Sequence, residues 1–238
     1  MSTFYLDNCK YEFTSDNVNI FCFLYDVSGS MEPDVAAMRK ANIAFYDDFS
    51  EFKDKGSIAI AKAIFASGYG MSNFESIENF NTGYSVGGGT KLYYAICETV
   101  DNIIRYYNEI VKRLNVRPRI TFLVFSDGDD NESPDCYPKA KEKIKELNSM
   151  DATTIFVAFR DAIKEKSGEK LGFTCTREID NVNELISCMG KELSKSCKEQ
   201  SKSAYSLKSK FFSKINNTPK EDEKTEEEIF DDNFWDIN

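Results

Sequence analysis

Apolar residues follow two patterns along this chain, and the two patterns alternate. In four stretches they run with little polar alternation, as expected of strands that are covered on both faces of a sheet. These stretches are FCFL (21–24), SIAIAKAIF (57–65), the start of RITFLVFSDG (119–128) and TTIFVAF (153–159). Between them, apolar residues recur every three or four positions, as on one face of a helix. The alternation predicts an α/β fold with a doubly wound, mostly parallel sheet and helices on both faces.

The longest periodic segments predict the helices. One follows the first strand from position 31 to 52, with Pro33 in its first turn, where proline is tolerated. Others are predicted from 92 to 114, near 138–149, within 161–171 and over 181–198. Two weaker patterns predict short edge strands. One lies at 74–80, antiparallel to its predecessor after a turn at 68–71, and the other lies at 173–179.

The acidic charge of the chain is concentrated near its end. The net charge is −10, and residues 220–238 hold nine acidic and two basic residues. High like charge with few apolar residues predicts a disordered acidic C-terminal tail. We therefore divide the chain into an N-terminal extension (1–16), a folded domain (17–199), and a lysine-rich segment that leads into the tail (200–238).

Aromatic residues stand among the acids of this tail. They include Phe230, Phe234 and Trp235, the last of which is the only tryptophan of the chain. Three interpretations remain open. The segment is a solubilising tail, or a docking peptide that these three residues anchor in a basic, apolar groove of a partner, or a segment that folds back onto the lysine-rich part of its own chain.

Composition removes several classes of function. An acidic chain is a poor candidate for binding nucleic acid or anionic membranes, and the lysines of 191–214 are expected to form a solvated helix face. No stretch is apolar and long enough to span a bilayer, and the first residues lack the apolar core of a secretory signal. The sequence therefore predicts a cytoplasmic protein with no membrane partner.

Two residue types narrow the chemistry further. The seven cysteines are odd in number and contain no C-x-x-C pair, which argues against a disulfide framework or a zinc knuckle. Histidine is absent, which excludes Ser-His-Asp triads, Cys-His dyads and histidine-ligated zinc. We therefore expect no enzyme. Any catalysis would need carboxylates, lysine or a metal.

Three loops carry the oxygen-bearing side chains that remain. Asp26, Ser28 and Ser30 follow the first strand, Thr90 ends a GGGT loop, and Asp127 follows the strand at 119–125. Strand ends of a doubly wound sheet meet at the switch point, where ligands bind. Two carboxylates and three hydroxyls are hard ligands that suit Mg²⁺ or Mn²⁺. The alternative is that Asp26 and the serines merely cap the next helix.

The elements D-x-S-x-S (26–30), Thr90 after a glycine run and S-D-G (126–128) resemble the metal-ion-dependent adhesion site (MIDAS) of von Willebrand factor A (vWA) domains. The resemblance covers residues 17–199 and implies a six-stranded sheet with one short antiparallel strand. It implies that Ser28, Ser30 and Thr90 approach a metal most directly, and that Asp26 and Asp127 act directly or through water. A partner's Glu or Asp would take the remaining metal position.

Within this family the sequence is most similar to the tellurium-resistance (TerY-like) group of bacterial stress-response proteins, whose partners include kinases and phosphatases. We therefore expect a metal-dependent protein-interaction module of a stress-response or defence complex. One alternative is an adaptor that acts mainly through its acidic tail. Another is a Mg²⁺-dependent phosphotransfer enzyme, but Ser28 occupies the place of its second acid. Thr90 precedes Lys91, so GGGTK is not a phosphate-binding P-loop.

Overall fold

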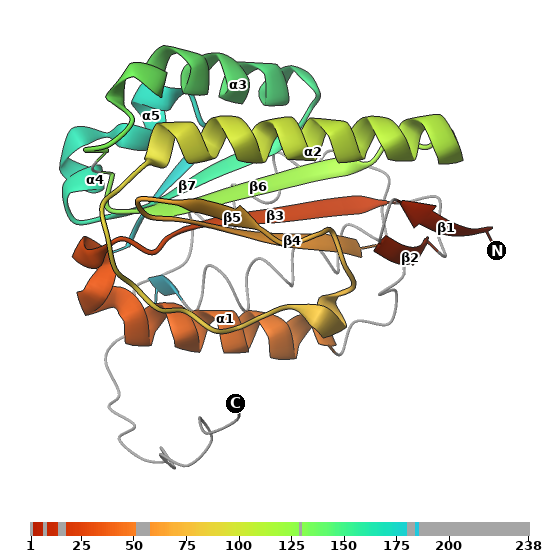
Figure 1. The fold of residues 1–238 in the computed structure, drawn as a ribbon, viewed down its shortest axis with the longest axis horizontal. Helices are drawn as coiled ribbons and strands as arrows, with labels where there is room; N and C mark the ends of the chain where they lie inside the picture. Colours follow the sequence, from red (N-terminus) through yellow and green to blue (C-terminus); the bar gives the residue numbers. More distant parts are fainter. Residues whose placement is uncertain are drawn as a thin grey trace, which may run out of the picture.

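A six-stranded sheet forms the centre of the molecule (Figure 1). The structure is a computed structural model that describes residues 2–6, 9–13, 18–50, 58–128, 130–179 and 184–185. The strand order is β5-β4-β3-β6-β7-β8, and all neighbours are parallel except β4 and β5. The strands are β3 (Asn19–Asp26), β4 (Ile58–Phe65), β5 (Tyr69–Met71), β6 (Arg119–Ser126), β7 (Thr153–Phe159) and β8 (Cys175–Ile179).

Helices cover both faces of this sheet, which confirms the predicted fold class. In Figure 1, α2 and α3 lie above the sheet and α1 lies below it. The helices are η1 (Gly29–Asp34), α1 (Val35–Ser50), η3 (Ile77–Asn79), α2 (Leu92–Leu114), η4 (Pro134–Cys136), α3 (Tyr137–Ser149), α4 (Asp161–Glu165) and α5 (Ser167–Leu171). None of the helices in this part of the chain combines the length and apolar character needed to cross a bilayer.

Two cores explain the unbroken apolar strands. Along β3, Ile20, Cys22 and Leu24 pack on the α2 side, and the alternate residues pack on the α1 side. An aromatic cluster fills the α1 side, where the rings of Tyr25 and Phe125 stack at 4.9 Å between centroids. Both faces of the strand are thus removed from water, so neither face selects polar residues.

The antiparallel edge strand is not where the sequence predicts it. The predicted turn at 68–71 contains β5, and the predicted strand at 74–80 makes one bridge to β4 and then forms η3. The buried residues of this segment are Phe74, Ile77 and Phe80, which lie three positions apart. Phe74 packs in the core on the α2 side, whereas Ile77 and Phe80 pack on the α1 side. The segment therefore passes around the edge of the sheet, which a paired strand cannot do.

Other departures are local. The first predicted helix begins as the 3-10 helix η1, which contains Pro33, and α1 starts at Val35. The predicted helix within 161–171 is broken at Lys166, which has φ 53°. The sequence predicts no strand in the N-terminal extension, yet β1 (Ser2–Leu6) and β2 (Cys9–Phe13) form an antiparallel pair there. The predicted helix over 181–198, apart from residues 184–185, and the tail lie outside the described residues.

Candidate functional site

The two predicted aspartates lie at neighbouring strand ends in the middle of the sheet. Asp26 is the last residue of β3, and Asp127 directly follows the last residue of β6. β3 and β6 are paired in parallel, with Tyr25 opposite Phe125. The connection after β3 runs into α1 below the sheet, while the connection after β6 runs into α3 above it. This is the switch point at which open α/β sheets bind ligands.

Asp26 is fully buried and held by two hydrogen bonds. Its Oδ1 accepts from the Ser28 backbone N–H at 2.9 Å, and its Oδ2 accepts from the Ser126 hydroxyl at 2.7 Å. The Ser126 oxygen in turn accepts from the Gly128 N–H at 2.9 Å. Burial raises the pKa of Asp26 to about 6, and the bonds from Ser126 and Ser28 only partly oppose that rise. A nearby cation would be needed to stabilise the charged form fully.

The two serines face each other. The Ser28 side chain is buried and the Ser30 side chain is exposed, and their Oγ atoms lie 3.0 Å apart. Ser28 occupies the N-cap position of η1, but its side chain makes no capping hydrogen bond. The helix-capping alternative therefore does not account for Ser28. The backbone of Ser28 is bonded to the buried Asp26, and its hydroxyl is paired with that of the exposed Ser30.

Asp127 contributes a buried carboxylate with one unused oxygen. Only 6% of the residue is exposed. Its Oδ2 accepts a hydrogen bond from Arg160 Nη2 at 3.0 Å, whereas its Oδ1 is buried and makes no hydrogen bond with any described residue. A buried carboxylate oxygen without a partner is costly, so an unmet ligand is the physical expectation at this point.

Thr90 is placed by the loop that follows β6. It is buried, its backbone N–H donates to Asn131 Oδ1 at 3.0 Å, and its carbonyl accepts from the Glu132 N–H at 3.1 Å. The preceding glycines attach this loop to the first one. The Gly29 N–H donates to the Gly88 carbonyl at 3.1 Å, and the Gly87 N–H donates to the Val27 carbonyl at 2.8 Å.

All three predicted loops are therefore connected at the carboxyl end of the sheet. The GGGT turn also requires a glycine. Gly88 has φ +85°, a conformation that other residues rarely adopt. The hydrogen bonds join the loop after β3 both to the GGGT loop and to the end of β6. The predicted residues are brought to one region, which comprises Asp26, Ser28, Ser30, Thr90 and Asp127.

The acids after Asp127 have mainly structural contacts. Asp130 accepts hydrogen bonds from the Tyr93 N–H at 2.7 Å and the Ser133 hydroxyl at 2.7 Å, which fixes the start of α2. Glu132 accepts from the Ser67 hydroxyl at 2.8 Å and lies 3.6 Å from Lys91 Nζ. These two residues are therefore engaged in contacts within the fold.

Two residues of this region are absent from the sequence-based set. Ser126 supports Asp26, and its signal was its place in the S-D-G motif. Arg160 supports Asp127, and its signal was its position immediately after the buried strand β7, at the same sheet edge. Both belong to strand ends at the switch point. The composition of a strand end alone does not reveal which residues turn inward.

The donor set fits a hard divalent cation. It offers buried carboxylate oxygens, of which Asp127 Oδ1 makes no hydrogen bond with the described part of the chain, and the paired hydroxyls of Ser28 and Ser30. Among the described residues no group of three or more His, Cys, Asp or Glu side chains forms a metal cluster. A metal at this edge would therefore depend on hydroxyls as well as carboxylates, which selects Mg²⁺ or Mn²⁺ over softer ions.

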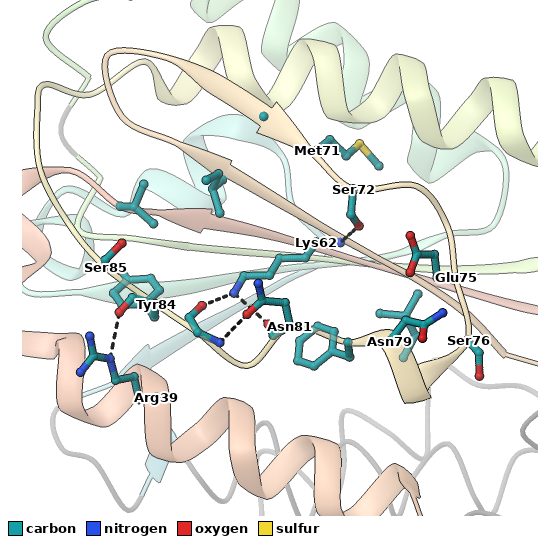
Figure 2. Close-up of a pocket in the computed structure, with 16 residues that line it drawn as sticks. Arg39, Lys62, Met71, Ser72, Glu75, Ser76, Asn79, Asn81, Tyr84 and Ser85 are labelled. Atoms are coloured by element: carbon teal, nitrogen blue, oxygen red, sulfur yellow. Dashed lines mark hydrogen bonds between the residues drawn. The ribbon is translucent and has the colours of Figure 1, made fainter. Parts of the chain in front are cut away.

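A separate cavity of about 680 Å³ lies on the α1 side of β4 (Figure 2). Lys62 extends from β4 toward Asn81, where its Nζ donates to the Asn81 carbonyl at 2.9 Å and also to the Gly83 carbonyl. The same Nζ lies 5.2 Å from the centroid of the Tyr25 ring. Burial lowers the pKa of Lys62 to about 8. This lysine holds the 81–83 loop against the sheet.

Comparison with known proteins gives a likeness of fold. No protein-family model matches the sequence, and no curated protein matches it. Among solved structures, the pilus adhesin SpaC from Lactobacillus rhamnosus GG matches with 12% identity and a TM-score of 0.63, over 81% of this chain and 32% of the adhesin. The PilB minor pilin from Streptococcus sanguinis matches with 11% identity and a TM-score of 0.54, over 77% of this chain and 62% of the pilin.

A third structure is that of a metal-loaded protein. Manganese-loaded Plasmodium vivax TRAP protein matches with 15% identity and a TM-score of 0.52, over 72% of each chain. This chain spans about a third of the adhesin and less than two thirds of the pilin. At these identities the matches show a shared architecture of sheet and helices and leave the chemistry of this chain to its own residues.

Proposed function

Because the chain has a vWA-like α/β fold, we propose that it is a metal-dependent protein-interaction module. In this proposal Mg²⁺ or Mn²⁺ is held at the switch point, and a Glu or Asp side chain of a partner protein completes its coordination. The residues that would hold the metal are Asp26, Ser28, Ser30, Thr90 and Asp127. The resemblance in sequence to the MIDAS pattern and the arrangement of the three loops support the same residues.

One observation carries the proposal. The Oδ1 atom of Asp127 is buried and has no hydrogen-bond partner among the residues that the structure describes, and it lies at the same sheet edge as the buried carboxylate of Asp26. Arg160 supplies a cation to Asp127 Oδ2 alone, so two buried carboxylates this close together stay unfavourable unless a further cation is supplied. When bound, the metal would supply a concentrated positive charge that attracts a carboxylate from outside.

The residues around the site set its geometry and its access. Ser126 and the Ser28 N–H hold both oxygens of Asp26 in place. Ser30 and Gly29 are exposed, so the site meets solvent at the first loop. The backbone bonds between Gly29 and Gly88 and between Val27 and Gly87 keep the two loops together. Preorganised loops of this kind favour specific recognition, since little order has to be gained on binding.

The wider context stays a proposal from sequence resemblance. It places the module in the cytoplasm, in a bacterial stress-response complex of the TerY-like kind, with a kinase or phosphatase as a partner. The adaptor alternative depends on Phe230, Phe234 and Trp235, which lie outside the described residues. We propose that the domain binds its partner protein and does not catalyse a reaction. The phosphotransfer alternative predicts instead that the protein releases phosphate from a substrate or moves it between substrates.

The proposal is tested by capture of the partner from the host lysate on immobilised protein. Capture is expected in Mg²⁺, loss is expected in EDTA, and an excess of free glutamate should elute the partner. Asp127→Asn should lose the partner in either condition. Asp161→Asn removes an exposed acid that is paired with Lys164, so it serves as the matched control and should capture normally.

Deletion of residues 220–238 distinguishes the two modes of interaction. If the shortened protein still captures the partner in a metal-dependent way, the domain is the recognition surface. Capture that is equal in Mg²⁺ and EDTA, and that disappears with the deletion, would overturn the proposal in favour of the adaptor.

A further inference from the structure

Arg160 is a cation built into the candidate metal site. It follows β7 directly and has φ +44° and ψ −104°, a combination that residues other than glycine rarely adopt. From this position its guanidinium reaches toward the end of β6. Its Nη2 atom lies 3.0 Å from Asp127 Oδ2 and 3.1 Å from Asp34 Oδ2.

Negative charges outnumber positive ones around Arg160. Two carboxylates, Asp127 and Asp34, contact one guanidinium, and a third carboxylate, Asp26, lies buried close enough to Asp127 for the two charges to repel each other. The Asp127 side chain is 8% exposed, whereas that of Arg160 is 37% exposed. The arginine therefore neutralises a carboxylate that water scarcely reaches, and it does so from a partly solvated position.

We propose that Arg160 competes with the metal for Asp127 and thereby sets the metal affinity of the site. This inference rests on the proposed function. A guanidinium beside a metal ligand lowers metal affinity in two ways. It already satisfies one oxygen of that ligand, and it repels a divalent cation placed nearby.

The guanidinium has a second acidic neighbour without moving from this position. Asp34, in η1, is within 3.1 Å of the same Nη2 atom, and the Met31 sulfur lies 3.6 Å away. Arg160 can therefore give up Asp127 without losing its last acidic partner. Because its side chain is partly exposed, solvent can replace the remaining contact.

Competition of this kind couples metal and partner. A partner carboxylate adds negative charge beside both cations, so it offsets the repulsion that Arg160 imposes. Each ligand should then raise the affinity of the other, as linkage requires. This arrangement predicts that the site binds metal weakly by itself and tightly only when an acidic partner is bound.

The test is calorimetric titration of Mn²⁺ into the full chain after removal of metal with EDTA and dialysis. Arg160→Gln removes the charge and keeps much of the size, and should bind Mn²⁺ about tenfold more tightly than wild type. Arg160→Lys keeps the positive charge that repels the metal and should stay within about threefold of wild type. Lys164→Gln removes one positive charge from α4, where Lys164 pairs with the exposed Asp161, and should leave the affinity unchanged.

A second readout needs no metal. In EDTA, Arg160→Gln should lower the melting temperature more than Lys164→Gln does, because Asp127 loses its only charged partner among the described residues. If Arg160→Gln binds Mn²⁺ no more tightly than wild type, or less tightly, the competition is wrong while the metal site stands. If neither wild type nor any variant binds Mn²⁺, the metal site fails, and the inference fails with it.

Discussion

At the scale of single residues, Asp26 shows how the proposed binding function would oppose stability. Its carboxylate is fully buried, and the hydrogen bonds from Ser28 and Ser126 do not restore its ordinary pKa. Burial raises the folded-state pKa of Asp26 to about 6, above the usual 3.8. The stability that the protonated Asp26 contributes is therefore fully present below pH 3.8 and is lost as the pH rises through about 6. At neutral pH and without metal, the ionised form is therefore a liability to the fold.

Asp26→Asn should separate these two effects. The amide keeps the size of the side chain, its oxygen can still accept from the Ser28 N–H, and its NH₂ group can donate to Ser126. In EDTA at pH 7.5 we expect the variant to be more stable than wild type by about 1–2 kcal/mol, because no charge is buried. Urea unfolding measures this difference. A variant that is less stable than wild type in EDTA would contradict the account.

The same substitution should weaken metal binding strongly. Loss of one of two carboxylates is expected to reduce Mn²⁺ affinity by about 100-fold or more, since both acids bring the negative charge of the site. Calorimetric titration measures it, and Asp161→Asn is the control. Unchanged affinity in Asp26→Asn would mean that the metal, if bound, lies elsewhere.

The sequence was informative about residues that carry charge or hydroxyls at strand ends. Asp26, Ser28, Ser30, Thr90 and Asp127 were found because they follow buried strands or a glycine run. Arg160 follows a buried strand too, yet nothing in the local sequence indicates that its side chain turns back to Asp127. That orientation depends on the unusual backbone at Arg160 and on long-range packing, which no local pattern encodes.

At the scale of elements, the contact between the β6 end and α4 depends on Gly128. Its φ is +86°, and a Cβ atom there would lie 2.7 Å from Ala162 Cβ and 2.8 Å from Ala162 Cα. The short helix α4 can therefore pack against the loop that carries Asp127 only because this side chain is missing.

Gly128→Ala should destabilise the protein by about 2–4 kcal/mol, because both the backbone strain and the clash with α4 act against the folded state. Gly68→Ala is the matched control, since a Cβ at Gly68 meets nothing within 4 Å. Chemical denaturation measures both variants. Equal stability of the two would mean that neither the backbone strain at position 128 nor the close approach of α4 costs free energy.

The loop that covers β4 depends on Lys62. Burial lowers the pKa of this lysine from 10.5 to about 8, so the unfolded state binds more protons between those two values. The contribution of Lys62 to stability should therefore rise as the pH increases from 8 to 10.5. The buried phenols and thiols act in the opposite direction, since their pKa values are raised.

Comparison with Lys62→Met isolates the lysine from those other groups. The stability of wild type relative to this variant should increase on the order of 1 kcal/mol between pH 7.5 and 10, a value reduced because Lys62 is only partly buried. Denaturation curves at the two pH values give this difference. A constant difference would mean that the lysine titrates normally, because its bonds to the Asn81 and Gly83 carbonyls offset the effect of burial.

Strands and helices with strong periodicity were predictable, and the edge strand β5 was not. β6, β7 and α2 appear at or close to their predicted positions because burial on both faces, or on one face of a helix, leaves a clear pattern. The edge near β5 was misplaced because Phe74, Ile77 and Phe80 serve two different cores. A local pattern of apolar residues does not state which side of the sheet each one will meet.

At the scale of the whole molecule, the loops of the candidate site join strands that contribute to both cores, at the carboxyl end of the sheet. A ligand that binds there is linked to the stability of the entire fold. At a concentration one hundred times its dissociation constant, Mn²⁺ should stabilise the protein by about 2.7 kcal/mol. For a domain of this size the melting temperature should rise by roughly 5–10 °C. Scanning calorimetry measures the shift, which EDTA should reverse and Asp26→Asn should lack.

The central claim is that a divalent metal occupies the switch point, and anomalous diffraction from crystals grown with Mn²⁺ tests it most directly. The account predicts one strong anomalous peak, bounded by the side chains of Asp26, Ser28, Ser30, Thr90 and Asp127. A peak at another place, or no peak in this region at saturating Mn²⁺, would contradict it.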